Sequence, residues 1–514
     1  MRANKDTFRF GKDALTTETL YRLAASCDVP GIVTDDTWEK LNKLREDVEG
    51  FLKSGVASYG INTGFGFLSN VKINQGDLSA LQQNLVRSHA CGVGNPSSAE
   101  VVRGLLLLRV HTFCVGYSGI SRQVVDTLLR FLKHDILPVI PEQGSVGASG
   151  DLAPLAHLAL GLMGEGRCFF EGEVVDAKIA LKKAGVEPVK LGPKEGLSLI
   201  NGTHYMTALA AFAVEEAKIL LKSADVIAAL SLDAVRGTTT AFDPRIHQAR
   251  PHLGQALVAE NFYSKLFATT DPILKSHENC DRVQDPYSFR CIPQVHGASR
   301  DCLDFVQQKV EIELNSVTDN PLVVNGVIVS GGNFHGQIIS LSMDLLTMAV
   351  SEIGSISERR TEKMTNPSMS GLPSFITKNG GLNSGYMIPH VVAAALASEN
   401  KILCHPASTD SIPTSADKED HVSMGPIAAR KCRTVIRNVS KILAIELLAA
   451  CQGIDLLAPL EPNKILKEVY SLVRSVSPYM DQDRSLHQDI EKISELILKG
   501  DIIRQVEKLG VELN

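Results

Sequence analysis

The sequence predicts a mainly α-helical protein, organised as a long antiparallel helical bundle with a smaller N-terminal mixed region and a few short β-hairpins. Two observations lead to this fold class. Along most of the chain, apolar residues recur every three to four positions, which is the period of a helix that buries one face. Residues 203–235 form a much longer run that is apolar nearly all round between Ala208 and Val214, so this helix should lie inside a bundle.

Ten stretches show the helical spacing. They are residues 78–89, 99–114, 121–134, 152–163, 203–235, 301–316, 337–360, 387–403, 427–457 and 486–498. Asp151 directly precedes one of them and has the side chain of an N-cap, so we expect it to cap the helix that starts at residue 152. Aromatic residues make up 5% of the chain, which suits close packing between helices.

Strand signals are few. Residues 323–329 have an Asn325-Gly326 centre between apolar flanks, which is typical of a hairpin with a two-residue turn. Residues 169–175 form a second, weaker hairpin candidate. From these patterns the chain divides into an N-terminal mixed α/β region over residues 1–115 and an elongated helical bundle domain over residues 116–514.

Composition narrows the class of protein. With 44% hydrophobic and 21% charged residues the chain has the balance of a soluble globular protein, and its net charge of −6 argues against a nucleic-acid partner. The start lacks an apolar signal segment and no run of ~18 apolar residues occurs, so we expect a cytoplasmic protein that does not bind a membrane. The ten cysteines are scattered without metal-ligand spacing, which predicts reduced thiols and no metal site.

The most informative segment is residues 142–154, Glu-Gln-Gly-Ser-Val-Gly-Ala-Ser-Gly-Asp-Leu-Ala-Pro. Three small residues in succession, Ala148, Ser149 and Gly150, allow the backbone to fold back until the Gly150 nitrogen approaches the Ala148 carbonyl carbon. Ser149 carries a β-hydroxyl that can leave as water, so cyclisation and dehydration would produce a methylidene-imidazolone electrophile. The glycines also suit a phosphate-binding loop, but Asp151 stands where such a loop carries lysine and would repel phosphate.

This segment resembles the active-site sequence of the histidine and aromatic amino-acid ammonia-lyases, and the resemblance extends over most of residues 55–425. It is closest to the histidine-specific members of that family. The resemblance implies conversion of L-histidine to trans-urocanate and ammonia, the first step of histidine degradation. The substrate amino group would add to the methylidene carbon formed from Ala148-Ser149-Gly150, and no external cofactor or metal would be required.

Further residues match the family one by one. Tyr59, in a glycine-rich stretch, corresponds to the tyrosine that removes the substrate's β-proton, a task that requires its pKa to fall from about 10. Asn201, in Leu199-Ile200-Asn201-Gly202-Thr203, matches a residue that hydrogen-bonds the electrophile or the substrate. Phe334 matches a residue that shields the electrophile.

The segment 284–290, Gln-Asp-Pro-Tyr-Ser-Phe-Arg, resembles the family's substrate-binding part. Gln284 can hydrogen-bond the imidazolone or the substrate, and Tyr287 is expected near the electrophile. Arg290 offers a planar pair of donors suited to the α-carboxylate of an amino acid.

Two positions indicate the substrate. Ser88-His89 stands where the aromatic enzymes resemble Phe-Leu or His-Leu, and Glu419 replaces their neutral amide. A carboxylate and an imidazole can together hydrogen-bond both nitrogens of a histidine side chain, whereas a phenyl ring would leave both unpaired. Gln337 departs from the pattern, because histidine-specific relatives usually carry glutamate there.

Several alternatives remain open at this level. A tyrosine or phenylalanine ammonia-lyase, or a 2,3-aminomutase, would use the same electrophile on another amino acid. A helical scaffold without catalysis is a further alternative, although it would have no need of Tyr59, Ser149, Tyr287 and Arg290 together. The resemblance also implies a homotetramer whose active sites are shared between subunits.

Overall fold

The structure is a computed structural model that describes residues 7–25, 31–53, 60–68, 70–277 and 283–514. The chain forms two compact units, each assembled from three stretches of sequence. Unit 1 consists of residues 1–212, 307–343 and 406–430, and unit 2 of residues 213–306, 344–405 and 431–514. The boundary predicted at residue 115 falls inside unit 1 and stays a prediction.

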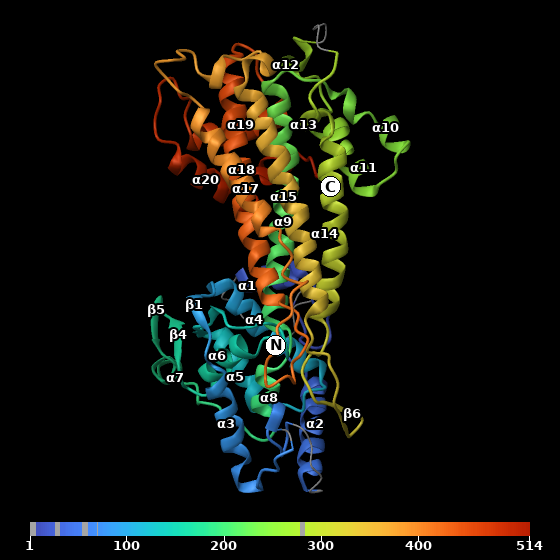
Figure 1. The fold of residues 1–514 in the computed structure, drawn as a ribbon, viewed down its shortest axis with the longest axis vertical. Helices are drawn as coiled ribbons and strands as arrows, with labels where there is room; N and C mark the ends of the chain where they lie inside the picture. Colours follow the sequence, from blue (N-terminus) through green and yellow to red (C-terminus); the bar gives the residue numbers. More distant parts are fainter. Residues whose placement is uncertain (1–6, 26–30, 54–59, 69, 278–282) are drawn as a thin grey trace. The chain divides into compact units, whose positions relative to one another are not determined.

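Helices dominate both units, so the predicted mainly α-helical class is confirmed (Figure 1). The helices of unit 1 are α1 (Thr17–Ala25), α2 (Asp35–Lys53), α3 (Leu78–His89), α4 (Ala99–Val115), α5 (Arg122–Lys133), α6 (Leu152–Leu162), α7 (Ala177–Ala184) and α8 (Glu195–Ile200). Those of unit 2 are α10 (Pro244–Gln248), α11 (Leu253–Glu260), α12 (Pro272–Lys275), α13 (Tyr287–Arg290), α16 (Pro367–Ser370), α17 (Met387–Leu403), α19 (Lys464–Val476), α20 (His487–Leu498) and α21 (Asp501–Glu507). Short 3₁₀ turns cover Gly66–Leu68, Gln75–Asp77, Thr239–Phe242 and Ser374–Ile376, and Asn261–Leu266 is a π-helical turn.

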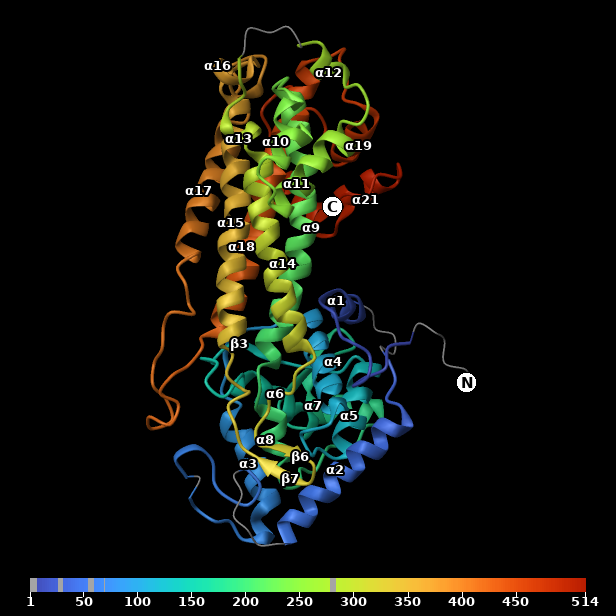
Figure 2. The same ribbon diagram turned by 90° about the vertical axis from the view of Figure 1, so that its right-hand side faces the viewer.

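Four long helices have residues in both units. They are α9 (His204–Ala234), α14 (Ile292–Leu314), α15 (Gln337–Thr365) and α18 (Gly425–Leu456). Within unit 2 these helices run side by side (Figures 1 and 2). By length and composition α15 meets the test for a membrane span, but 61% of its most apolar window is buried in the protein, as in the core helix of a bundle.

Inside unit 2, buried ion pairs join α9 to α14 and α15 to α18. Asp225 of α9 accepts hydrogen bonds from His296 and Arg300 of α14, each at 2.7 Å. Arg360 of α15 pairs with Glu446 of α18 at 2.5 and 3.0 Å, and neither side chain is exposed. A charge removed from water must be paired to be tolerated, so these contacts specify which helix faces align.

The strands are short and antiparallel. Their bounds are β1 (Val93–Pro96), β2 (Leu137–Pro138), β3 (Pro141–Gln143), β4 (Arg167–Phe170), β5 (Glu173–Asp176), β6 (Leu322–Val324) and β7 (Val327–Val329). They pair as β1–β3, β2–β4–β5 and β6–β7. Both predicted hairpins are confirmed: Asn325 and Gly326 turn at φ of 49° and 75°, and Glu171 and Gly172 at 53° and 82°. The β6–β7 hairpin is labelled in Figure 2.

Most predicted helices agree with the structure to within a few residues, and α3 and α17 agree at both ends. The helix predicted from residue 301 was placed too late, because α14 begins at Ile292. The part that the prediction missed contains Pro293 and Gly297. Proline is tolerated in a first turn, and a Cβ at Gly297 would lie 2.3 Å from the Gln255 nitrogen, so this glycine allows close helix packing.

The predicted role of Asp151 as side-chain cap of α6 is wrong. Its side chain makes no capping hydrogen bond there, and its Oδ2 instead accepts the Met206 N–H in the first turn of α9 at 2.9 Å. The carboxyl is fully buried, and that burial raises its pKa to about 7. Asp151 therefore joins the start of one helix to the start of another.

The Arg360–Glu446 pair makes a testable contribution to stability. We expect Arg360→Met to lower the free energy of unfolding by about 3–5 kcal/mol, because Glu446 would remain buried without its cation. Calorimetric unfolding measures the effect. The control is Arg504→Met, which breaks a more exposed pair with Asp501. Equal unfolding temperatures for the two variants would contradict the role of the buried pair.

Candidate active site

Residues Ala148, Ser149 and Gly150 lie in the loop between β3 and α6, and glycine shapes this loop at two positions. Gly147 and Gly150 have φ of +66° and +74°. A Cβ at Gly147 would lie 2.3 Å from Ser423 Oγ, and one at Gly150 would lie 2.1 Å from the Gly202 carbonyl oxygen. Any side chain would therefore force the loop away from both neighbours.

The Ser149 backbone carbonyl and hydroxyl are held from two sides. Its carbonyl oxygen accepts hydrogen bonds from Asn201 Nδ2 at 2.8 Å and from the Gly202 N–H at 3.3 Å. Its hydroxyl donates to Glu419 Oε1 at 2.9 Å. Ala148 packs on Val422 with only 7% of its surface exposed, so the loop contacts segments far from it in sequence.

Glu419 is positioned by an unusual turn. Ser415, Ala416 and Asp417 have φ of 53°, 53° and 62°, which is a left-handed backbone in three successive non-glycine residues. The second carboxylate oxygen of Glu419 accepts the Thr414 hydroxyl at 2.7 Å. The hydroxyls of Thr414 and Ser149 therefore hold one carboxylate oxygen each.

These residues surround a pocket of about 410 Å³ in unit 1. Five of the predicted site residues line it, namely His89, Ser149, Asn201, Phe334 and Glu419. The other lining residues are Phe65, Gly66, Leu85, Leu152, Leu197, Ile200, Asn320, Ser330, Gly331, Ser415 and Lys418. Residues from six separated parts of the sequence thus meet at the loop that carries Ser149.

His89 is the last residue of α3, and its hydrogen bonds define its tautomer. Its Nδ1 lies 2.8 Å from the Leu85 carbonyl oxygen, which can only accept, so Nδ1 carries the proton. Nε2 is then the ring nitrogen left to accept a hydrogen bond. The Ser88 hydroxyl turns back to the Leu85 carbonyl at 3.0 Å, and Ser88 is not a lining residue of the pocket.

Gln284, Tyr287 and Arg290 lie in unit 2, where they line a different and larger pocket of about 1230 Å³. The Arg290 guanidinium carbon lies 4.9 Å from the centre of the Tyr287 ring, and 72% of Tyr287 is exposed. None of the three lines the pocket of unit 1. Tyr59 lies outside the described residues.

The structure adds residues that sequence reasoning missed. Asn320, Ser330 and Gly331 form one wall of the unit 1 pocket, where Asn320 Oδ1 accepts the Gly331 N–H at 2.7 Å. Asn320-Pro321 and Gly331-Gly332 are turn signals at the two ends of the β6–β7 hairpin, but no local signal says what the turns face. Gln337 donates to the Ser408 carbonyl at 3.1 Å and does not line the pocket, and its effect on specificity stays a prediction.

The burial of His89 leads to a prediction about how stability depends on pH. Burial lowers the pKa of His89 from 6.5, so we expect a neutral imidazole at pH 7. Because the unfolded chain binds this proton more readily, the stability due to His89 is present above pH 6.5 and is lost as the pH falls through the lower folded pKa. NMR titration of ¹⁵N-labelled histidines, assigned with His89→Gln, measures this pKa, and a value above 6.5 would contradict it.

Comparison with known proteins identifies the family of the chain. A family model described as aromatic amino acid lyase matches residues 15–475. The chain is 48% identical over 483 residues to a histidine ammonia-lyase from Alkaliphilus oremlandii, covering 94% of each chain. It is similar to the crystal structure of histidine ammonia-lyase from Trypanosoma cruzi (TM-score 0.89, 45% identity, 97% of this chain and 95% of the other). It is also similar to tyrosine aminomutase from Streptomyces globisporus (TM-score 0.93, 36% identity, 99% and 100%). The chain belongs to the aromatic amino acid lyase family.

Proposed function

We propose that this protein is a histidine ammonia-lyase that converts L-histidine to trans-urocanate and ammonia in the cytoplasm. The observation that carries the proposal is one pocket in which Ser149, of an Ala-Ser-Gly triad, faces both His89 and Glu419. The Alkaliphilus oremlandii relative bears the same name at 48% identity over nearly the whole chain.

The residues around the triad fit a methylidene-imidazolone formed from Ala148, Ser149 and Gly150. Asn201 Nδ2 and the Gly202 N–H already donate to the Ser149 carbonyl oxygen and would hold the same atom of the ring. Asn201 Oδ1 is buried without a hydrogen-bond partner in the described part of the chain, so it is available to a substrate donor. The ring supplies an electrophilic carbon at the former Ser149 side chain, where it activates the amino group as a leaving group.

The polar side chains of the pocket explain the choice of histidine. His89 Nε2 and the Glu419 carboxylate are both hydrogen-bond acceptors, so a neutral histidine side chain can donate its one N–H to one of them and an imidazolium can donate to both. A phenyl ring has no such donor and would leave both acceptors desolvated and unpaired. Selection therefore rests on the penalty for leaving these groups without a partner.

Two steps, removal of the β-proton and binding of the substrate carboxylate, require further groups. Tyr59 acts as the base that removes the β-proton of the substrate. The substrate carboxylate is matched by a cation. Among the described lining residues of the unit 1 pocket, Lys418 is the one Lys or Arg. Arg290, in unit 2, has the planar pair of donors that suits a carboxylate.

We infer that Gln284, Tyr287 and Arg290 reach this pocket from another subunit of a homotetramer. The exposure of 72% of Tyr287 in the single chain supports such an assembly, because a large aromatic side chain gains from being covered.

A tyrosine-specific or phenylalanine-specific lyase, or an aminomutase, is the second candidate. The amide of Gln337 favours it, since the aromatic branch of the family carries glutamine there. The fold does not discriminate, because the tyrosine aminomutase from Streptomyces globisporus has a closely similar structure. Product identity separates the candidates: a lyase releases ammonia and an unsaturated acid, and an aminomutase releases a β-amino acid.

Removing the Ser149 hydroxyl tests the electrophile. We expect Ser149→Ala to abolish lyase activity while the chain stays folded, because alanine has no hydroxyl to leave as water. Intact-mass measurement should give a wild-type chain two water molecules lighter than its translated sequence, and the variant should lack the loss of the serine water. Ser475→Ala, at an exposed hydroxyl of α19, is the control. Full activity in folded Ser149→Ala would overturn the electrophile.

Relative turnover of amino acids tests the substrate. We expect the wild type to favour L-histidine over L-phenylalanine by ~10⁴ in kcat/KM, the cost of leaving the acceptors unpaired. Glu419→Gln should narrow this ratio mainly by lowering histidine turnover, because the amide is nearly isosteric but uncharged. Ultraviolet absorbance of the unsaturated products measures each rate. Comparable kcat/KM values for histidine and tyrosine in the wild type would defeat the histidine assignment and leave the lyase class standing.

A further inference from the structure

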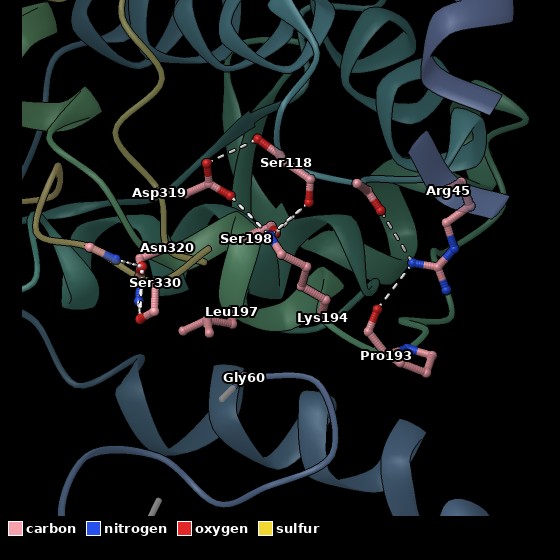
Figure 3. A network of polar contacts seen from close by, with 12 residues as sticks. Arg45, Gly60, Ser118, Pro193, Lys194, Leu197, Ser198, Asp319, Asn320 and Ser330 are labelled. Atoms are coloured by element: carbon pink, nitrogen blue, oxygen red, sulfur yellow. Dashed lines mark hydrogen bonds and ion pairs between the residues drawn. The ribbon is translucent and has the colours of Figure 1, made fainter. Parts of the chain in front are cut away.

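A buried lysine lies behind the pocket of unit 1. The Lys194 ammonium donates to the Ser118 carbonyl at 2.7 Å, to Ser198 Oγ at 2.8 Å and to Asp319 Oδ2 at 3.3 Å, which uses all three of its donors. The side chains of Lys194 and Asp319 are 0% and 2% exposed. Figure 3 shows the two side chains converging from separate segments.

Both residues of this ion pair are close in sequence to residues that line the pocket. Lys194 is the N-cap residue of α8, and Leu197, Ile200 and Asn201, in and after that helix, line the pocket. Asp319 is followed by Asn320, another lining residue.

The Asn320 side chain continues the second wall. Its Oδ1 accepts from the Gly331 N–H at 2.7 Å and from Ser330 Oγ at 3.2 Å (Figure 3). The lysine thus joins a helix at residues 195–200 to the segment 319–331, which contains the β6–β7 hairpin.

The backbone of Lys194 gives a second indication. Its φ of 70° lies in the left-handed region, where a non-glycine residue is strained. Glycine would adopt this conformation without strain, so the lysine side chain must contribute something that offsets it. A buried ion pair is seldom more stabilising than apolar residues of the same size, which points to geometry rather than stability as that contribution.

We propose that Lys194 is a positioning residue, which through Asp319 fixes α8 and the Asn320 turn so that Asn201 holds the Ser149 carbonyl. This role rests on the proposed function, in which the side chain of Ser149 becomes the electrophilic carbon. A neutral contact between the same segments, from the Thr203 N–H to Thr318 Oγ1 at 3.1 Å, supports the alignment. The charged pair lies at the start of α8, where that neutral contact does not reach.

The test uses Lys194→Met, which keeps the length and backbone preference of the side chain and removes the ammonium. Arg103→Met is the control in the same unit, because Arg103 is a buried cation whose hydrogen-bond partners, the more exposed Asp135 carboxylate and the Ala24 carbonyl, do not line the pocket. Thermal unfolding, intact mass and steady-state kinetics on L-histidine are measured for the full-length chain.

We expect kcat per cyclised chain to fall at least ~10-fold and up to ~10²-fold in Lys194→Met, with KM nearly unchanged, because a small misplacement beside the reacting atoms is costly. The fraction of chains that are two water molecules lighter should also fall. Arg103→Met should lose thermal stability and keep both values. If folded Lys194→Met matches this control in kcat and in cyclised fraction, the positioning role is overturned.

A second variant tests the same proposal if Lys194→Met does not fold. Asp319→Asn removes the negative charge, keeps Oδ1 as an acceptor for Lys194 and presents Nδ2 as a donor to the Ser118 hydroxyl, so it should fold and lose kcat in the same direction. Unchanged kcat in this variant would also overturn the proposal. A wild type that turns over no histidine contradicts the proposed function alone, and the cyclised fraction of each variant then still decides the role of Lys194.

Discussion

The site in unit 1 depends on the close approach of Gly150 and Gly202. A side-chain carbon at Gly150 would lie 2.1 Å from the Gly202 carbonyl oxygen, so the loop that carries Ser149 can lie against the segment that follows α8 only without one. From this contact the Asp151 N–H donates to the Gly202 carbonyl at 2.8 Å, and Asn201 reaches the Ser149 carbonyl. Asp151 then holds the first turn of α9 through Met206. The chemistry proposed for Ser149 and the start of α9 therefore depend on the same few atoms.

Buried charge keeps this arrangement in place. Arg109 is fully buried and donates to the Ser198 carbonyl near the C-terminal end of α8, where a cation complements the helix dipole. Its other nitrogen lies 2.8 Å from His204 Nδ1. Burial, with the Arg109 charge as a smaller cause, lowers the pKa of His204 well below its ordinary value, so this imidazole is a neutral acceptor for the guanidinium. The Lys194 ammonium donates to the hydroxyl of the same Ser198, so two buried cations hold this residue of α8.

Unit 2 uses a similar device around its own pocket. Burial, with the neighbouring Asp271 carboxyl as a smaller cause, raises the pKa of Asp233 well above its ordinary value. Asp271 also caps α12 and accepts the Asn463 N–H at 2.8 Å. Asp285, beside Gln284, accepts the Thr238 N–H at 2.7 Å. The Asp285 contact fixes the start of the segment that carries Tyr287 and Arg290.

The sequence by itself determined the helical class, the spans of helices such as α3 and α17, both hairpins and the Ala148-Ser149-Gly150 triad. These features depend on local periodicity, turn chemistry and adjacent residues, which a short window contains. Only the tertiary structure decided that Asp151 holds α9, that Glu419 receives the Ser149 hydroxyl, and that Asn320 and Ser330 form a wall of the pocket. It also separated Tyr287 and Arg290 from Ser149 into different pockets, although the sequence had grouped them by resemblance. Contacts between residues 149, 201 and 419 depend on how distant segments pack, and local patterning carries no record of that packing.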